Sequence, residues 1–199
     1  MNTKFFNNVN ENTLFNKLSG IAKHMHGFDK FLAVAGYFRS SGYFKLRKEL
    51  LKFRKEYGDL TEIKILVGIN VDGIFNRHDR ALLSLASPKE AKEIYRSDFC
   101  ADVASARYSP EVEEGIIQMY DDLSSGRLEM RIHPSKNLHA KFYLCLPEAH
   151  SADSDGWVIM GSSNLSDSGL GVARSERYEL NVAMKDYSEV NYCVNEFWT

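Results

Sequence analysis

The sequence predicts one α/β domain in which a mixed β-sheet is flanked by helices on both faces. Two apolar runs, at 29–38 and 62–71, enclose a segment with helical spacing, and this strand–helix–strand order is typical of parallel strands. Four more short apolar or alternating runs follow later in the chain, at 127–133, 138–146, 157–163 and 178–186. The 199 residues contain no repeat and no internal linker, so we expect a single domain over 1–199.

Two helices are predicted on either side of the first strand. Residues 10–27 have an apolar face made of Leu14, Phe15, Leu18, Ile21 and Ala22. The second helix follows the strand; Ser40 or Ser41 is its expected N-cap and Gly58 its expected end.

The middle of the chain, from about 78 to 125, is predicted to be helical and to be interrupted at Pro88 and Pro110. Ser109 is expected to cap the helix that Pro110 begins, and Gly126 to end it. A last helix is expected over 188–199, with an apolar side made of Val190, Val194, Phe197 and Trp198.

Composition and cysteine spacing indicate the cellular compartment in which we expect the protein to work. No apolar run approaches the roughly 18–20 residues that span a bilayer, and the N-terminus lacks the apolar core of a secretory signal. Three widely spaced cysteines favour free thiols in a reducing compartment over a disulfide framework or a zinc site. We therefore expect a cytoplasmic protein without membrane association. The chain stops inside the last predicted helix, so we also expect it to be the N-terminal part of a longer protein.

One segment of the chain is basic, although the net charge of the whole is −2. Residues 39–58 carry seven Lys and Arg side chains against two Glu. A solvated helix face explains such a segment, and so does part of a nucleic-acid channel, because binding depends on the charges at the contact rather than on the total. Both interpretations stay open at this point.

Polar side chains interrupt three neighbouring predicted strands. His139 and Lys141 share one face of their strand, about 6–7 Å apart. Ser162 and Asn164 share a face where the next strand ends, and ligands of α/β sheets commonly bind at the carboxyl ends of strands. Glu179 lies in the following apolar strand, and a carboxylate there can accept a hydrogen bond from an imidazole and fix its tautomer.

This set of residues resembles the active-site signature of the phospholipase D superfamily. The resemblance rests on His139-x-Lys141, on the Gly-Ser-Ser-Asn segment 161–164 and on Glu179. The family pattern continues from His-x-Lys through four residues to an aspartate, a position that Leu146 occupies here. Nuclease members often lack this aspartate. The chain is therefore most similar to the nuclease-like branch, which includes domains of restriction endonucleases and of bacterial helicase-like proteins.

The resemblance implies a metal-independent phosphodiesterase that needs no cofactor. His139 would attack phosphorus and form a phosphohistidine, and a second imidazole would protonate the leaving oxygen. Lys141 and Asn164 would hold the non-bridging phosphate oxygens. Glu179 would orient His139, and Ser162 would support the phosphate.

The resemblance also implies a homodimer, because the mechanism uses two imidazoles and the chain has one His-x-Lys motif. DNA is the expected substrate, and the candidate contacts to it are Arg39, Ser41, Arg174 and Arg177. Helicase or DNA-recognition domains of the same longer chain are possible further partners. Two alternatives remain: a DNA-binding module with little or no catalysis, and, less favoured, a phospholipid-hydrolysing enzyme.

Overall fold

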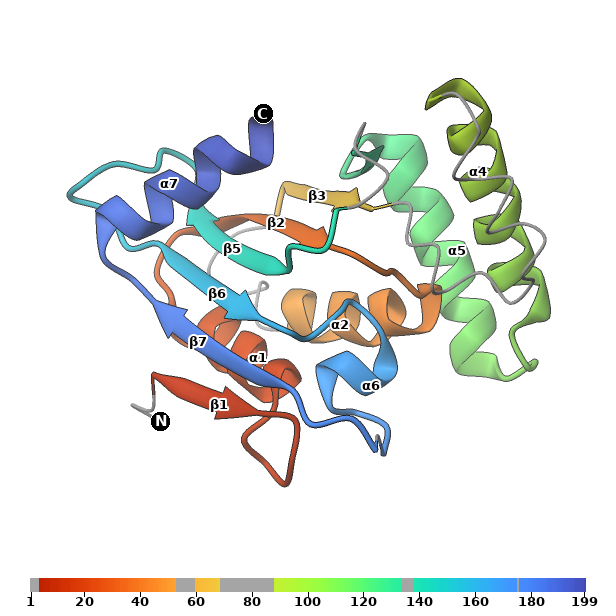
Figure 1. Ribbon diagram of the computed structural model, residues 1–199, viewed down its shortest axis with the longest axis horizontal. Helices are drawn as coiled ribbons and strands as arrows, with labels where there is room; N and C mark the ends of the chain where they lie inside the picture. Colours follow the sequence, from red (N-terminus) through yellow and green to blue (C-terminus); the bar gives the residue numbers. More distant parts are fainter. Residues whose placement is uncertain (1–3, 53–59, 69–87, 134–137, 175) are drawn as a thin grey trace.

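The computed structural model describes residues 4–52, 60–68, 88–133, 138–174 and 176–199. Within these residues the strands form one seven-stranded mixed sheet in the order β1-β7-β6-β5-β2-β3-β4 (Figure 1). The strands are β1 (Phe5–Asn7), β2 (Phe28–Ala35), β3 (Glu62–Val67), β4 (Leu128–Ile132), β5 (Phe142–Pro147), β6 (Trp157–Gly161) and β7 (Leu180–Met184). The helices are α1 (Leu14–His24), α2 (Ser40–Lys52), α4 (Pro88–Ser105), α5 (Pro110–Ser125), α6 (Asp167–Leu170) and α7 (Tyr187–Trp198).

The sheet combines a parallel half with an antiparallel half. β2, β3 and β4 pair in parallel, as the strand–helix–strand pattern predicts for the first two. β5 pairs antiparallel to β2, and β6, β7 and β1 continue in alternating directions. The prediction of an α/β domain with a mixed sheet is therefore confirmed.

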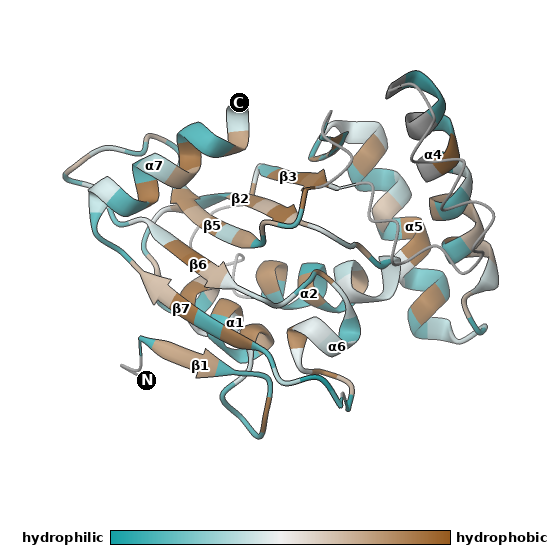
Figure 2. Cartoon of the chain, in the orientation of Figure 1, coloured by the Kyte–Doolittle hydropathy of each residue, from teal (hydrophilic) through white to brown (hydrophobic). Residues whose placement is uncertain are grey.

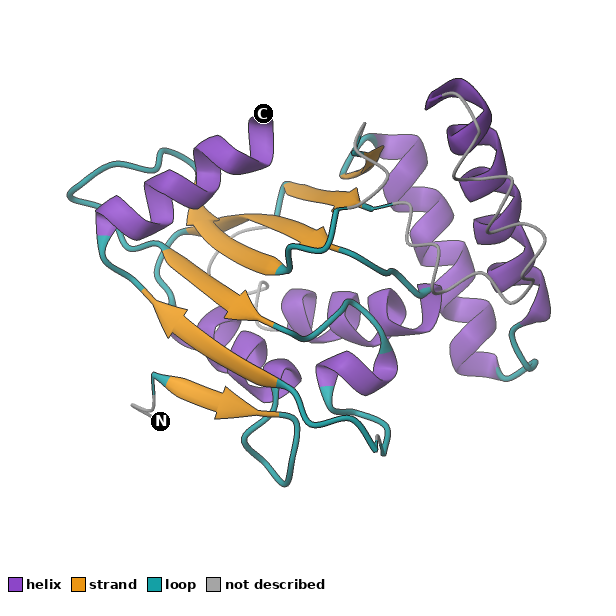
Figure 3. Cartoon of the chain, in the orientation of Figure 1, coloured by secondary structure: helices purple, strands orange, loops and turns teal. Residues whose placement is uncertain are grey.

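Helices cover both faces of the sheet, and each face has its own apolar cluster (Figure 3). The larger cluster joins α1, α2 and α5 to one face, where Phe31, Ala33 and Tyr143 point. The smaller cluster joins α7 to the other face through the buried side chains of Val190, Cys193 and Phe197. Figure 2 shows hydrophobic residues along the central strands, while hydrophobic and hydrophilic residues alternate along the helices. Because side chains alternate along a strand, the central strands are apolar on both faces.

Helix ends follow the local sequence closely in two cases. Thr13 caps α1 by accepting from Asn16 N, and Ser109 caps α5 by accepting from Val112 N. Gly126 follows α5 with φ 78°, a left-handed conformation that glycine adopts without steric cost. The predicted cap and stop of α5 are confirmed.

The predicted N-cap of α2 is wrong by one position. α2 begins at Ser40, so Arg39 occupies the cap position and its carbonyl accepts from Tyr43 N at 3.3 Å. The missing side-chain cap comes from another helix, because Asp102 of α4 accepts from both the amide and the hydroxyl of Ser40. Gly58, the predicted end of this helix, lies outside the described residues, as do residues 69–71 of the second strand and 78–87 of the predicted helical stretch.

The predicted last helix is confirmed, with one exception on its apolar side. Trp198 is 48% exposed rather than buried, and its ring lies under the cations of Lys64 and Arg131, 4.7 and 4.6 Å from the ring centroid. Cys193 takes a place in the core instead. Cys100, Cys145 and Cys193, which all lie in the described part of the chain, form no disulfide.

Candidate functional site

Four chain segments meet at one end of the sheet because of the strand directions. Val34, near the end of β2, pairs with Phe142 at the start of β5. Phe142 pairs with Met160, near the end of β6, and Gly161 pairs with Asn181 at the start of β7. The register therefore gathers the residues after β2, before β5, after β6 and before β7. These segments contain the five polar residues that the sequence singles out: His139, Lys141, Ser162, Asn164 and Glu179.

Lys141 and Asn164 meet beside Gly36, the residue that follows β2. A Cβ placed on Gly36 would lie 3.2 Å from Lys141 Nζ and 3.6 Å from Asn164 Oδ1. The absence of a side chain at position 36 leaves room for both polar groups. The structure thus brings together an ammonium and an amide that are remote in the sequence.

The side chain of Asn164 is held by a backbone contact. Its Oδ1 accepts a hydrogen bond from Tyr37 N at 2.9 Å. Because the amide oxygen is occupied, the Nδ2 group is the part of the side chain that can donate to a ligand. An amide donor fixed in this way costs little reorganisation when an anion binds.

Lys141 is buried with an exposed fraction of 6%, and its Nζ donates to the carbonyl of His139 at 2.6 Å. Burial lowers the pKa of the Lys141 ammonium, and the negative charge of Glu179 partly offsets that shift. An ammonium has three donors, so this lysine retains capacity for a further acceptor. Burial removes water from around the ammonium of Lys141, and a bound anion would compensate its positive charge in place of that water.

His139 is exposed and lies just before β5, at the same end of the sheet. Among the described residues its imidazole makes no hydrogen bond to Glu179. The carboxylate acts instead on Lys141 and on the buried Tyr143, whose pKa is raised first by burial and then by this negative charge. The pairing of His139 with Glu179 stays a prediction.

The serines after β6 are tied into the fold. Ser163 is fully buried; its hydroxyl accepts from Asn181 Nδ2 at 2.9 Å and its carbonyl accepts from the Tyr143 hydroxyl at 2.8 Å. Ser162 is exposed, and its hydroxyl accepts from Leu180 N at 3.0 Å. These bonds fix the path of the backbone that presents Asn164.

The strand predicted over 138–146 starts later, at Phe142. The chain before it passes the ends of two parallel strands: a Cβ placed on Gly36 would lie 3.3 Å from the carbonyl oxygen of Leu138, and one placed on Gly68 would lie 2.6 Å from it. His139 therefore lies outside the sheet. This path of the chain also explains why His139 is exposed while Lys141, two residues later, is buried.

Leu146 lies at the far end of β5, where it pairs with Lys30. It comes five positions after Lys141, which is about 16 Å along an extended strand. Its side chain is 3% exposed and belongs to the apolar cluster under α7. The departure from the family pattern at this position therefore removes no polar group from the candidate site.

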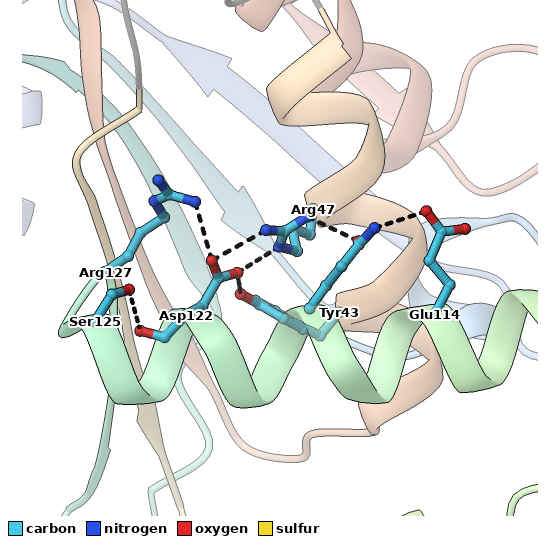
Figure 4. Close-up of polar contacts among 7 residues, drawn as sticks. Tyr43, Arg47, Glu114, Asp122, Ser125 and Arg127 are labelled. Atoms are coloured by element: carbon cyan, nitrogen blue, oxygen red, sulfur yellow. Dashed lines mark hydrogen bonds and ion pairs between the residues drawn. The ribbon is translucent and has the colours of Figure 1, made fainter.

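Several cations of the basic segment are paired inside the protein. Arg47 donates to Asp122 and to Gln118, and Asp122 also accepts from the hydroxyl of Tyr43 at 2.7 Å and from Arg127 at 3.1 Å (Figure 4). This network joins α2 to α5. Arg47 is therefore turned towards α5.

The candidate DNA contacts divide into two groups. Arg39 forms an ion pair with Asp102, and Ser41 is half-buried on the first turn of α2. Arg174 and Arg177 are both exposed in the segment between α6 and β7. Lys45, also in the basic segment, pairs with Asp167 at 3.0 Å. Arg174 and Arg177 are thus better placed than Arg39 and Ser41 to contact a large ligand.

Two site residues were not predicted from the sequence, Gly36 and Tyr37. Their signal is the end of an apolar run, "AVAGYF", where a glycine follows three small or branched residues. A glycine at the carboxyl end of a buried strand commonly marks close approach by another group. That approach is the meeting of Lys141 and Asn164.

Comparison with known proteins gives no relative: no family model matches the chain, and no curated protein matches it. Within the described residues there is no cluster of three or more His, Cys, Asp or Glu side chains that could hold a metal ion. No helix in the described part of the chain is long and apolar enough to cross a membrane.

Proposed function

We propose that this chain is a metal-independent phosphodiesterase acting on DNA, with a phospholipase D-like fold and a phosphohistidine intermediate. The observation that carries the proposal is the meeting of Lys141 and Asn164 beside Gly36, with His139 exposed at the same end of the sheet. A buried ammonium and a fixed amide donor suit the two non-bridging oxygens of a phosphodiester. His139 supplies a nucleophile next to them.

In the proposed reaction an imidazole nitrogen of His139 attacks phosphorus, and the bond from phosphorus to the leaving oxygen breaks. A second imidazole gives its proton to that oxygen. Water then attacks the phosphohistidine, its proton is taken up by the second imidazole, and His139 is released. Lys141 and Asn164 stabilise the negative charge that develops on the equatorial oxygens in both steps.

The second imidazole would come from a second copy of the chain. An apolar surface beside β5 supports a dimer: Met160 pairs with Val182, which pairs with Phe5 across three adjacent strands. Met160, Leu180 and Phe5 are 36%, 53% and 64% exposed. An exposed apolar surface of this kind is typical of a protein interface. We name Phe5, Met160, Leu180 and Val182 the β6–β7 surface.

DNA is favoured as the substrate by the exposed arginines that follow α6. Arg174 and Arg177 lie on the segment that connects the Asn164 loop to Glu179. Guanidinium groups in that position suit contacts to phosphates on either side of the scissile one. Such contacts would fix the register of a strand without reading its sequence.

The test is cleavage in excess EDTA of supercoiled plasmid and of single-stranded DNA. Wild type and His139→Ala are compared, with His24→Ala as the matched control, because His24 is an exposed histidine at the end of α1. Cleavage that wild type and His24→Ala share and His139→Ala lacks supports the proposal. DNA binding without cleavage by any of the three would favour the non-catalytic module. Hydrolysis of phosphatidylcholine vesicles but not of DNA would favour a lipid substrate.

A further inference from the structure

An open pocket of about 500 Å³ lies next to the candidate site. Its wall includes Tyr37, Arg39 and Ser41 on one side and Ser168 and Ala173 on the other. The first group follows β2 and the second follows β6, so part of the wall comes from the two segments that bring Gly36 and Asn164 together. Asp102 and Ser105 of α4 complete the wall.

The two loops are joined along the pocket by backbone contacts. Phe38 and Leu165 form a parallel bridge, and Arg39 N donates to the carbonyl of Leu165 at 2.9 Å. Tyr37 N donates to Asn164 Oδ1. Tyr37 directly follows Gly36, and consecutive α-carbons are about 3.8 Å apart. A ligand held by Lys141 and Asn164 could therefore extend directly into the pocket.

The charges of the pocket argue against a phosphate as its occupant. The ionisable acids and bases on its wall are Arg39, Asp102 and Asp167. Arg39 is paired with Asp102, and Asp167 is paired with Lys45. Each of these groups is in an ion pair, so the wall offers a phosphate no excess positive charge.

The remaining groups favour a polar, uncharged and partly aromatic ligand. Five serines line the pocket, and a hydroxyl both donates and accepts hydrogen bonds. The ring of Tyr37 is half-buried and lies 5.0 Å from the guanidinium of Arg39. Aromatic and guanidinium planes are the groups on which unstacked bases rest. The volume is within the range of pockets that hold small organic ligands.

We infer that this pocket binds the nucleoside next to the scissile phosphate, an inference that rests on the proposed function. The phosphate is held by Lys141 and Asn164, and the attached sugar and base enter between Tyr37 and Ala173. A base in this position is not stacked in a duplex, so the substrate is DNA with an unpaired nucleotide at the cleavage point. Single-stranded DNA is then cleaved faster than a duplex of the same sequence.

The test uses two small substrates, thymidine 5′-(4-nitrophenyl phosphate) and bis(4-nitrophenyl) phosphate, of which only the first has a nucleoside. The variant Ala173→Trp fills the pocket from an exposed position. Ala149→Trp is the matched control, because Ala149 is exposed just after Pro147, at the opposite end of β5. The measured quantity is the ratio of kcat/KM for the first substrate to kcat/KM for the second.

We expect Ala173→Trp to lower this ratio about tenfold or more, and Ala149→Trp to leave it within twofold of wild type. A ratio that Ala173→Trp does not change, while both substrates are hydrolysed, overturns the pocket and leaves the proposed function standing.

If neither substrate is hydrolysed, that result counts against the proposed function. A binding measurement then tests the pocket alone. The probe is 2-aminopurine deoxyriboside, whose fluorescence falls when its base stacks. Quenching by wild type that Ala173→Trp reduces supports the pocket, and no quenching by wild type overturns it.

Discussion

Replacement of Asp122 by asparagine should destabilise the fold strongly, although it changes one atom. Asp122 is 1% exposed and accepts hydrogen bonds from three side chains, those of Tyr43, Arg47 and Arg127 (Figure 4). An asparagine has one acceptor oxygen, and its NH2 group would face the donors of one arginine. Arg47, which is 12% exposed, would lose the negative charge that compensates it.

The size of the effect follows from these contacts. Breaking a buried ion pair by removing one partner typically costs about 3–5 kcal/mol, because the remaining charge is left without compensation. The new amide keeps one acceptor, so we expect the lower part of this range, about 3 kcal/mol. For a domain of this size that loss lowers Tm by about 6–12 °C.

Acid should remove the stabilisation by the Asp122 carboxylate in the wild type. Burial alone would raise the pKa of Asp122, but the hydrogen bonds from Arg47 and Tyr43 and the nearby charges hold it below its ordinary value of 3.8. The group therefore stabilises the fold fully above about pH 4, and its contribution is lost as the pH falls through the lowered pKa. The difference in stability between wild type and Asp122→Asn should shrink over that acidic range.

The assay is urea unfolding followed by circular dichroism at pH 7 and at several values below 4. Asp121→Asn is the matched control, because Asp121 is the exposed neighbour on the same helix. The reasoning is refuted if Asp122→Asn loses no more free energy of unfolding than Asp121→Asn. A loss that does not vary with pH would refute the account of its charge.

Three further outcomes are expected at the site. Lys141→Met should lower the rate of DNA cleavage about 100-fold or more without lowering the free energy of unfolding, since it removes a buried ammonium; a destabilised but active variant would contradict its role. Leu180→Glu should convert a dimer to a monomer in light scattering and abolish cleavage, and a fully active monomer would exclude the shared site. Leu146→Asp should lower stability in urea by about 2–4 kcal/mol and leave activity no higher than wild type; a gain in activity would mean that Leu146 is near the substrate.

The central part of the fold is predicted well because its pattern is local. The parallel pairing of β2 with β3 follows from two apolar runs and the helix between them. The ends of α5 follow from Ser109, Pro110 and Gly126, whose conformational preferences act within a few residues. In these places local preference and tertiary packing agree.

The missed features depend on distant partners. β1 has three residues, of which Phe5 is exposed, and it exists because it pairs with β7. The start of α2 is set by Asp102, which comes from another helix. A short edge strand and a borrowed cap leave no periodic signal in the sequence.

The candidate site shows the same division. The polar residues His139, Lys141 and Asn164 stand out because they lie within or at the end of apolar runs that the sequence predicts as strands. Their meeting point, Gly36, does not stand out, because only the strand register brings it beside them. Leu146 is the opposite case. It occupies a position of the family motif, but the strand register places it far from the candidate site.

The hydrogen bond between Tyr37 and Asn164 has a consequence for how the protein folds. It joins residues 127 positions apart, and it requires β5 and β6 to be inserted beside β2 first. Closing so long a loop costs entropy that only the completed strand pairs repay. We therefore expect α1, β2 and α2 to be ordered early in refolding, while the contact between Lys141, Asn164 and Gly36 forms only with the slowest pairing of the sheet.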